Sequence, residues 1–139
     1  MDERCVLLEL GRERFCLQEP LVEKIEQCRP LISLPRVGDW TTGIRIEGRQ
    51  IAVGFDLARW LNCSGEPQAE TYQLLCSLRD MLLCLPVSQV AAIVPQAHGD
   101  WAPADDEQLA RGCERVFVYR KLRYPLLNIE MMVRLLESN

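Results

Sequence analysis

The sequence predicts a mainly β protein built from two related halves within one domain. Apolar and polar residues alternate along several short segments, which is the pattern of strands with one buried face. The same succession of segments occurs twice along the chain. The length of 139 residues is that of a single domain, and it provides enough core for folding without disulfides or a structural metal.

The first predicted element is a hairpin at the start of the chain. Large apolar side chains alternate over residues 6–10, Gly11 supplies a turn residue, and residues 14–17 return as a second strand. The next segment, residues 21–32, places apolar side chains at helical spacing, although Pro30 would end a helix there. We therefore expect a short connector after the first hairpin.

A second hairpin is predicted after residues 34–40, whose proline and glycine disfavour regular structure. Isoleucines alternate with charged residues over residues 44–47, a glycine supplies the turn, and residues 50–55 return as a strand. Asp56 is expected to cap a short helical segment at residues 57–61. Its carboxylate can accept a hydrogen bond from a free amide of the first turn.

The second half of the sequence repeats the first. The apolar pattern of residues 6–25 recurs at residues 74–93, displaced by 68 positions, and residues 53–57 match residues 125–129, displaced by 72 positions. The alternative is a chance coincidence of apolar residues in a strand-rich sequence. Residues 94–112 are longer and more polar than their counterpart, so we expect a mobile loop there.

Catalytic and metal-binding motifs are absent from the sequence. The single histidine, His98, lies between proline and glycine neighbours, which indicates a solvated loop. The acidic run at residues 105–107 is expected to begin a helix rather than to hold a cation. Asp56 and Asn128, which align in the repeat, are expected to be helix caps. We therefore expect no cofactor and no metal.

Composition limits the partners and the compartment. The net charge of −4 and a pI of about 5.1 disfavour binding to nucleic acid or to anionic lipid. No apolar stretch is long enough to span a membrane, and the start of the chain is unlike a signal peptide, so we expect a cytoplasmic protein without membrane insertion. The seven cysteines lack the paired spacing of zinc sites, and we expect buried, reduced thiols. A small thiol enzyme is the alternative.

Several residues stand in an order that is similar to the CheW-like family. The shared features are Leu34-Pro35 followed by a tryptophan, Gly43-Ile44 at the start of a hairpin, residues 51–57, and residues 126–130. The resemblance covers nearly the whole chain. It implies one CheW-like domain over residues 1–139, with two intertwined SH3-like five-stranded β-barrel subdomains and short helices. The first subdomain would span approximately residues 13–84 and the second the remainder, with strands exchanged at the ends.

The resemblance also implies a function. Family members have no catalytic activity; they couple methyl-accepting chemoreceptors to a CheA-type histidine kinase in chemotaxis or type IV pilus motility, at membrane-associated receptor arrays. The receptor signalling tip would bind an apolar groove between the barrels, and the kinase regulatory domain would bind the barrel ends. The expected protein-binding residues near the receptor groove are Val22, Ile25, Leu34, Pro35, Gly43, Ile44 and Ile46, and Lys24 and Glu47 are expected to tune specificity there. For the apolar members of this set, the alternative is a place in the core.

Two departures from the family pattern concern charge. Family members usually carry Asn-x-Arg-Gly at the first-half hairpin turn, where this chain has Ile46-Glu47-Gly48, and a usual acidic position holds Lys24. A reversed charge at an interface redirects specificity. The second hypothesis is therefore a diverged CheW-like scaffold or inhibitory module that has lost receptor coupling and binds another protein.

Overall fold

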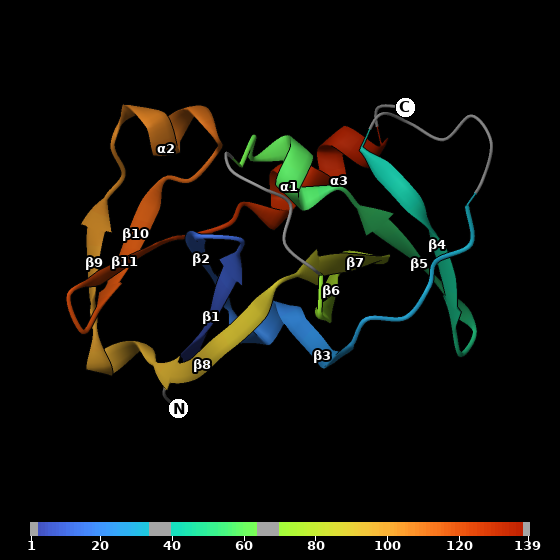
Figure 1. The fold of residues 1–139 in the computed structure, drawn as a ribbon, viewed down its shortest axis with the longest axis horizontal. Coiled ribbons are helices and arrows are strands. Elements are labelled where there is room, and N and C mark those ends of the chain that lie inside the picture. Colours follow the sequence, from blue (N-terminus) through green and yellow to red (C-terminus); the bar gives the residue numbers. More distant parts are fainter. Residues whose placement is uncertain (1–2, 34–39, 64–69, 138–139) are drawn as a thin grey trace.

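The computed structural model describes residues 3–33, 40–63 and 70–137 of the chain, and its described residues are mostly in strands (Figure 1). This confirms the predicted fold class. The strands are β1 (Arg4–Leu10), β2 (Glu13–Gln18), β3 (Val22–Gln27), β4 (Thr41–Glu47), β5 (Gln50–Phe55), β6 (Tyr72–Leu78), β7 (Met81–Val87), β8 (Gln89–Pro95), β9 (Asp100–Pro103), β10 (Arg115–Tyr119) and β11 (Leu122–Pro125). The helices are α1 (Leu57–Trp60), α2 (Asp106–Ala110) and α3 (Ile129–Glu137), with 3-10 turns η1 (Glu19–Leu21) and η2 (Gln96–His98).

The two halves exchange strands. One sheet has five strands in the order β3-β6-β7-β5-β4, and two sheets have three strands each, in the orders β2-β1-β8 and β11-β10-β9. The third strand of each half pairs with the first strand of the other, because β3 lies beside β6 and β8 lies beside β1. Two closed barrels of five strands, and the division near residues 13–84, stay predictions.

Hydrogen bonding follows the predicted repeat. β5 of the first half runs parallel to β7 of the second, with Gly54 opposite Cys84. In the equivalent contact an isolated parallel bridge joins Cys16 of the first half to Leu126 of the second, and the amide of Leu127 donates to the Cys16 carbonyl at 3.0 Å. Positions 54 and 126 are 72 apart, and positions 16 and 84 are 68 apart, which are the two displacements in the sequence.

Both predicted helix caps are present. The Asp56 carboxylate accepts a hydrogen bond from the amide of Arg59 at 3.2 Å, and the Asn128 side chain accepts one from the amide of Met131 at 3.0 Å. The acidic run also begins a helix as expected, since Asp105 forms a reciprocal capping box with Gln108. Each cap lies between a strand and the helix that follows it: Asp56 between β5 and α1, Asp105 between β9 and α2, and Asn128 between β11 and α3.

The pleat of the strands divides the core. Alternate residues of β1 face opposite sides, so Val6 and Leu8 enter the largest core, whereas Leu7 enters a smaller cluster with Cys5, Cys16, Val94, Phe117 and Tyr124. The largest core consists of Val6, Leu8, Leu10, Phe15, Leu17, Phe55, Leu57, Leu61, Leu74, Cys76, Leu83, Leu85, Val87, Leu127, Ile129, Met132 and Val133. Because residues of both halves fill this largest cluster, each half is stabilised by contact with the other.

Two expectations about regular structure are wrong. The segment with helical spacing is the strand β3, and a β-bulge between Val22 and Lys24 shifts its register, so that Val22 and Ile25 lie opposite Cys76 and Leu74 on one face. The bulge thus produces a spacing of three in a strand. The expected loop over residues 94–112 instead contains η2, β9 and α2.

Candidate protein-binding site

A surface groove lies where the two halves meet, between η1 and β3 on one side and β8 on the other. Figure 1 shows the strands β3 and β8 that border it. Its volume is about 380 Å³, and it is lined by Val6, Glu19, Pro20, Val22, Glu23, Lys24, Ile25 and Ile93. The floor and walls are largely apolar, and Ile93 is 41% exposed. An open apolar groove of this kind is a binding feature of protein surfaces.

The predicted binding residues divide between two places. Val22, Lys24 and Ile25 line the groove. Gly43, Ile44, Ile46 and Glu47 lie on β4 and do not line it, although the Glu47 carboxylate reaches Lys24 at 3.2 Å. Leu34 and Pro35 fall outside the described residues. A binding role for any of the nine residues stays a prediction.

The bulge in β3 brings two neighbouring charged residues to the groove. Glu23 is the extra residue between Val22, opposite Cys76, and Lys24, opposite Leu75. Neighbouring strand residues ordinarily face opposite sides, whereas a bulge re-aims one of them, so both Glu23 and Lys24 border the cavity. The same irregularity recurs in β8. There, Ala91 is the extra residue, 68 positions after Glu23.

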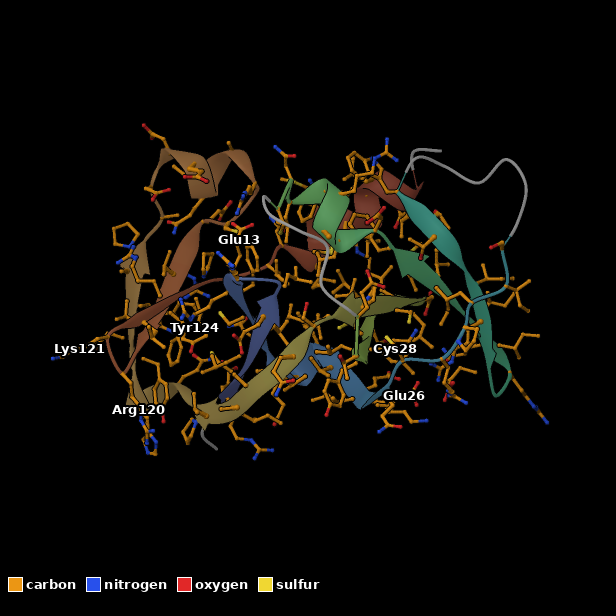
Figure 2. The ribbon with its side chains drawn as sticks, in the orientation of Figure 1. Glu13, Glu26, Cys28, Arg120, Lys121 and Tyr124 are labelled. Atoms are coloured by element: carbon orange, nitrogen blue, oxygen red, sulfur yellow. The ribbon has the colours of Figure 1, made fainter. Side chains whose placement is uncertain are left out.

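Beside the groove, an ion network centred on Arg45 joins β3 to β4. The Arg45 guanidinium, only 6% exposed, contacts the Glu26 carboxylate and reaches Glu47 at 2.5 Å. It also donates to the amide oxygen of Gln73 at 3.0 Å, and that amide in turn donates to the Arg29 carbonyl at 2.9 Å. Figure 2 shows Glu26 on the side of the molecule that holds β3 and β4, far from the β10–β11 turn marked by Arg120 and Lys121.

Lys24 and Arg29 complete the network from outside. The Lys24 ammonium lies 3.2 Å from both Glu26 and Glu47, and Arg29 lies 3.3 Å from Glu26 and 3.5 Å from Glu47. Although burial acts in the opposite direction, hydrogen bonds from Arg45, Lys24 and Arg29 lower the pKa of Glu26 to about 2. Hydrogen bonds from Arg45 and Lys24 likewise lower the pKa of Glu47, and those to Glu26 and Glu47 raise the pKa of Lys24.

The network also fixes one wall of the groove. β3 and β4 are the two outer strands of the five-stranded sheet, so the ion pairs between them hold the sheet in a curve. A single backbone bridge adds to this closure, because the amides and carbonyls of Ile32 and Ile44 exchange hydrogen bonds at 2.7 and 2.9 Å. Gly43 permits the bridge: its φ is +155°, and a Cβ there would lie 2.7 Å from the Ile32 carbonyl oxygen.

A second apolar surface lies on the outer face of the β4–β5 hairpin. Ile46 and Ile51 stand directly opposite each other and are 67% and 59% exposed, and Ile32, opposite Ile44, is 54% exposed. We call Ile32, Ile44, Ile46 and Ile51 the isoleucine face. Large apolar side chains grouped in this way mark interaction surfaces.

Some groove residues were not predicted from the sequence. Ile93 could have been, since the repeat aligns it with Ile25 at a displacement of 68, and both line the groove. Glu23 and Pro20 carried no sequence signal, because a bulge and a 3-10 turn direct them to the cavity. Ile51 joins the isoleucine face through its pairing with Ile46, which no local pattern predicts.

The thiols offer little reactivity. Burial raises the pKa of Cys63 and Cys76 to about 12 and that of Cys84 and Cys113 to about 11. A hydrogen bond from Cys16 lowers the pKa of Cys5, but Cys5 is fully buried. Within residues 3–33, 40–63 and 70–137, no group of three His, Cys, Asp or Glu side chains is placed to hold a metal ion.

Comparisons with known proteins identify the family and the fold of the chain. A family model described as CheW-like domain matches residues 4–137. The chain is similar in fold to the crystal structure of scaffolding protein TtCheW from Thermoanaerobacter tengcongensis, with a TM-score of 0.75, 14% identity, and coverage of 92% of this chain and 90% of that chain. No curated protein matches the sequence. Among the described helices, none has the length and apolar character needed to cross a bilayer.

Proposed function

Because the chain belongs to the CheW-like family, we propose that it is a non-catalytic adaptor that couples methyl-accepting chemoreceptors to a CheA-type histidine kinase. Family membership supports a coupling or scaffold role in chemotaxis signalling. The observation that carries the finer proposal is the groove between the two halves, which three of the predicted binding residues line. The protein would act in the cytoplasm, where receptor arrays present their signalling tips.

The receptor tip would dock in the groove. An apolar stripe of a helical segment could pack on Val22, Ile25 and Ile93, two of which come from β3 and one from β8. The ion network supports this by holding β3 in place, so that the groove is formed before the receptor arrives. Binding would therefore require no chemical step, and the signal would pass through the relative placement of the partners.

The kinase regulatory domain would use the isoleucine face. An adaptor that holds two proteins at once needs two separate surfaces, and the isoleucine face does not line the groove. Among the large apolar residues that the structure describes, Ile46 and Ile51 have the highest exposed fractions. We propose that the predicted residues Ile44 and Ile46 act at this second surface, whereas Gly43 is buried beneath it.

The two departures from the family pattern compensate each other. Lys24 and Glu47 form an ion pair at 3.2 Å, and Arg45 and Arg29 also contact Glu47. Their charges are therefore largely neutralised within the molecule. The reversed charges therefore give less support to the second hypothesis, a diverged scaffold or inhibitory module that has lost receptor coupling.

Titration with two purified fragments tests the proposal. A receptor signalling-tip fragment and a kinase regulatory domain are each titrated into the full chain, and binding is measured by calorimetry. Ile25→Asp should weaken receptor binding at least tenfold and leave kinase binding unchanged, and Ile46→Asp should do the reverse. Leu109→Asp, which changes an exposed leucine on α2, is the matched control and should alter neither.

The outcomes separate the hypotheses. Binding of both fragments with the expected split supports the adaptor. If neither fragment binds at tens of micromolar, the adaptor proposal is wrong and the diverged scaffold takes its place.

A further inference from the structure

We infer that the groove selects a partner segment that carries a basic residue beside its apolar stripe. Glu23 is the residue that forms an ion pair with this basic side chain. This inference rests on the proposed use of the groove as a docking site. It concerns the charge of the partner rather than its identity.

All the charge of the groove comes from one wall. The β8 wall contributes Ile93, and the bulged and following residues of that strand are Ala91 and Ala92. The opposite wall, η1 and β3, contributes Glu19, Glu23 and Lys24. A partner that lies across the groove therefore meets ionic groups on only one of its sides.

Two of these three charges are already paired. Glu19 forms an ion pair with Arg4 at 2.6 Å, and Lys24 is held at 3.2 Å by each of two carboxylates, those of Glu26 and Glu47. Glu23 is exposed and has no ion-pair partner in the part of the chain that the structure describes. The unpaired charge offered to a ligand is thus a single carboxylate.

The network keeps Lys24 neutralised. Arg45, which is buried, fixes both Glu26 and Glu47 from behind, so these two carboxylates cannot turn away from Lys24 without losing their own ion pairs. The other outer cation, Arg29, lines a different cavity together with Cys28 and Gln73. An acidic group on the partner would compete with two fixed carboxylates for Lys24 and would also face repulsion from Glu23.

The bulge gives Glu23 its position. As the extra residue of β3 it has no counterpart on β6, and its side chain borders the groove next to Lys24. The equivalent bulge of β8 holds Ala91, so the bulge is repeated in the second half but its carboxylate is not. A basic side chain beside the apolar stripe of the partner would therefore fix which way the partner lies in the groove.

Two synthetic helical peptides test the inference. They share one apolar stripe and differ only in the flanking residues, which are lysines in one and glutamates in the other, and their affinities for the full chain are measured by fluorescence anisotropy at low salt. The wild type should bind the lysine peptide about fivefold more tightly, a ratio typical of one exposed ion pair. Added salt should reduce the ratio.

Four variants show which residues cause the preference. Glu23→Gln should bring the ratio close to one, and Glu47→Gln, which releases one carboxylate from Lys24, should shift it toward the glutamate peptide. Glu107→Gln, the same substitution on α2 outside the groove, should leave the ratio at its wild-type value. Ile25→Asp should weaken both peptides, which verifies that they occupy the groove.

The possible failures are distinguishable. Equal binding of the two peptides by the wild type, or an unchanged ratio in Glu23→Gln, would overturn the charge preference and leave the groove as a docking site. If neither peptide binds, or if Ile25→Asp has no effect on either, the groove itself is not the docking site, and the proposed function then loses its main support.

Discussion

The β3–β4 side of the first half and the β8–β10 side of the second occupy equivalent places in the repeat, yet different chemistry closes them. Arg45 and Glu26 of the first half correspond to Phe117 and Val94 of the second, at displacements of 72 and 68. The first pair belongs to an ion network, and the second pair belongs to an apolar cluster. The same strand topology thus tolerates either solution.

The edge of the sheet differs in the same way. In the second half, β9 pairs with β10 along its whole length and places Trp101 beside Phe117, with ring centroids 5.2 Å apart. In the first half, the equivalent contact is the single bridge between Ile32 and Ile44. Backbone pairing and aromatic packing hold this edge in the second half, whereas a single backbone bridge and side-chain charges hold it in the first.

This difference suggests why the ion network is kept. Replacing a buried ion pair by apolar residues of similar size is often neutral or stabilising, so stability alone does not require Arg45 and Glu26. We hypothesise that the network is retained because it also sets the charge of the neighbouring groove. Variants that exchange the chemistry of the two sides test this comparison.

The largest effect is expected from the apolar side. Phe117→Ala removes a fully buried ring from the smaller apolar cluster and should lower the free energy of unfolding by about 3–5 kcal/mol. Urea unfolding followed by circular dichroism measures the change. A loss below about 1 kcal/mol would mean that the cluster does not close this side.

Substitution in the ion network should lower the free energy of unfolding almost as much, and a second substitution should restore most of the loss. Arg45→Met leaves the Glu26 and Glu47 carboxylates without their central cation and should cost about 3 kcal/mol in the same urea experiment. Adding Glu26→Val, which copies the valine of the second half, should recover most of that loss. If the double variant is no more stable than Arg45→Met, the two sides are not interchangeable.

The single bridge of the first half should be the next most sensitive point. Gly43→Ala places a Cβ against the Ile32 carbonyl oxygen at a positive φ and should cost about 2 kcal/mol. Gly48→Ala is the matched control, because its Cβ would meet open space and the equivalent Arg120 already adopts a positive φ. We expect a smaller loss there, measured in parallel, and equal losses would argue against the bridge.

The smallest effect is a pH dependence that only the first half should show. The pKa of Glu26 is lowered to about 2 from 4.5, so its ion pairs stabilise the folded state fully above pH 4.5, and this stabilisation is lost as the pH falls toward 2. Urea midpoints measured between pH 6 and 3 should fall less steeply for Glu26→Gln than for the wild type. Parallel slopes would exclude Glu26 as a source of acid sensitivity.

The sequence predicted those structural features that depend on neighbouring residues or on a periodic pattern. Alternation predicts the hairpins, the repeat predicts two related halves, which the equivalent parallel contacts at Cys84 and Cys16 match, and the caps at Asp56 and Asn128 follow from their side chains. The bulge at Glu23 imitates helical spacing, so periodicity alone misread β3. A short strand such as β9 within a polar segment has too few residues for alternation to show.

The candidate site was predicted only in part, because long-range pairing assembles it. Val22, Lys24 and Ile25 are neighbours in sequence and stay together in the groove, whereas Ile93 joins them through the exchange of strands. The ion network unites residues of β3, β4 and β6, and no local pattern marks Arg45 as its buried centre.

The exchange of strands also delays completion of the fold during synthesis. Leu8 of β1 pairs with Val90 of β8, so 82 further residues are synthesised after Leu8 before its partner on the open edge of the hairpin exists. At ribosomal speeds of about 5–20 residues per second, that wait lasts roughly 4–16 s. Such distant contacts also slow folding of the released chain. A nascent chain stalled before β8 would therefore expose the β1 edge, and protection from chaperones or proteases should appear only once residues 89–95 have left the ribosome.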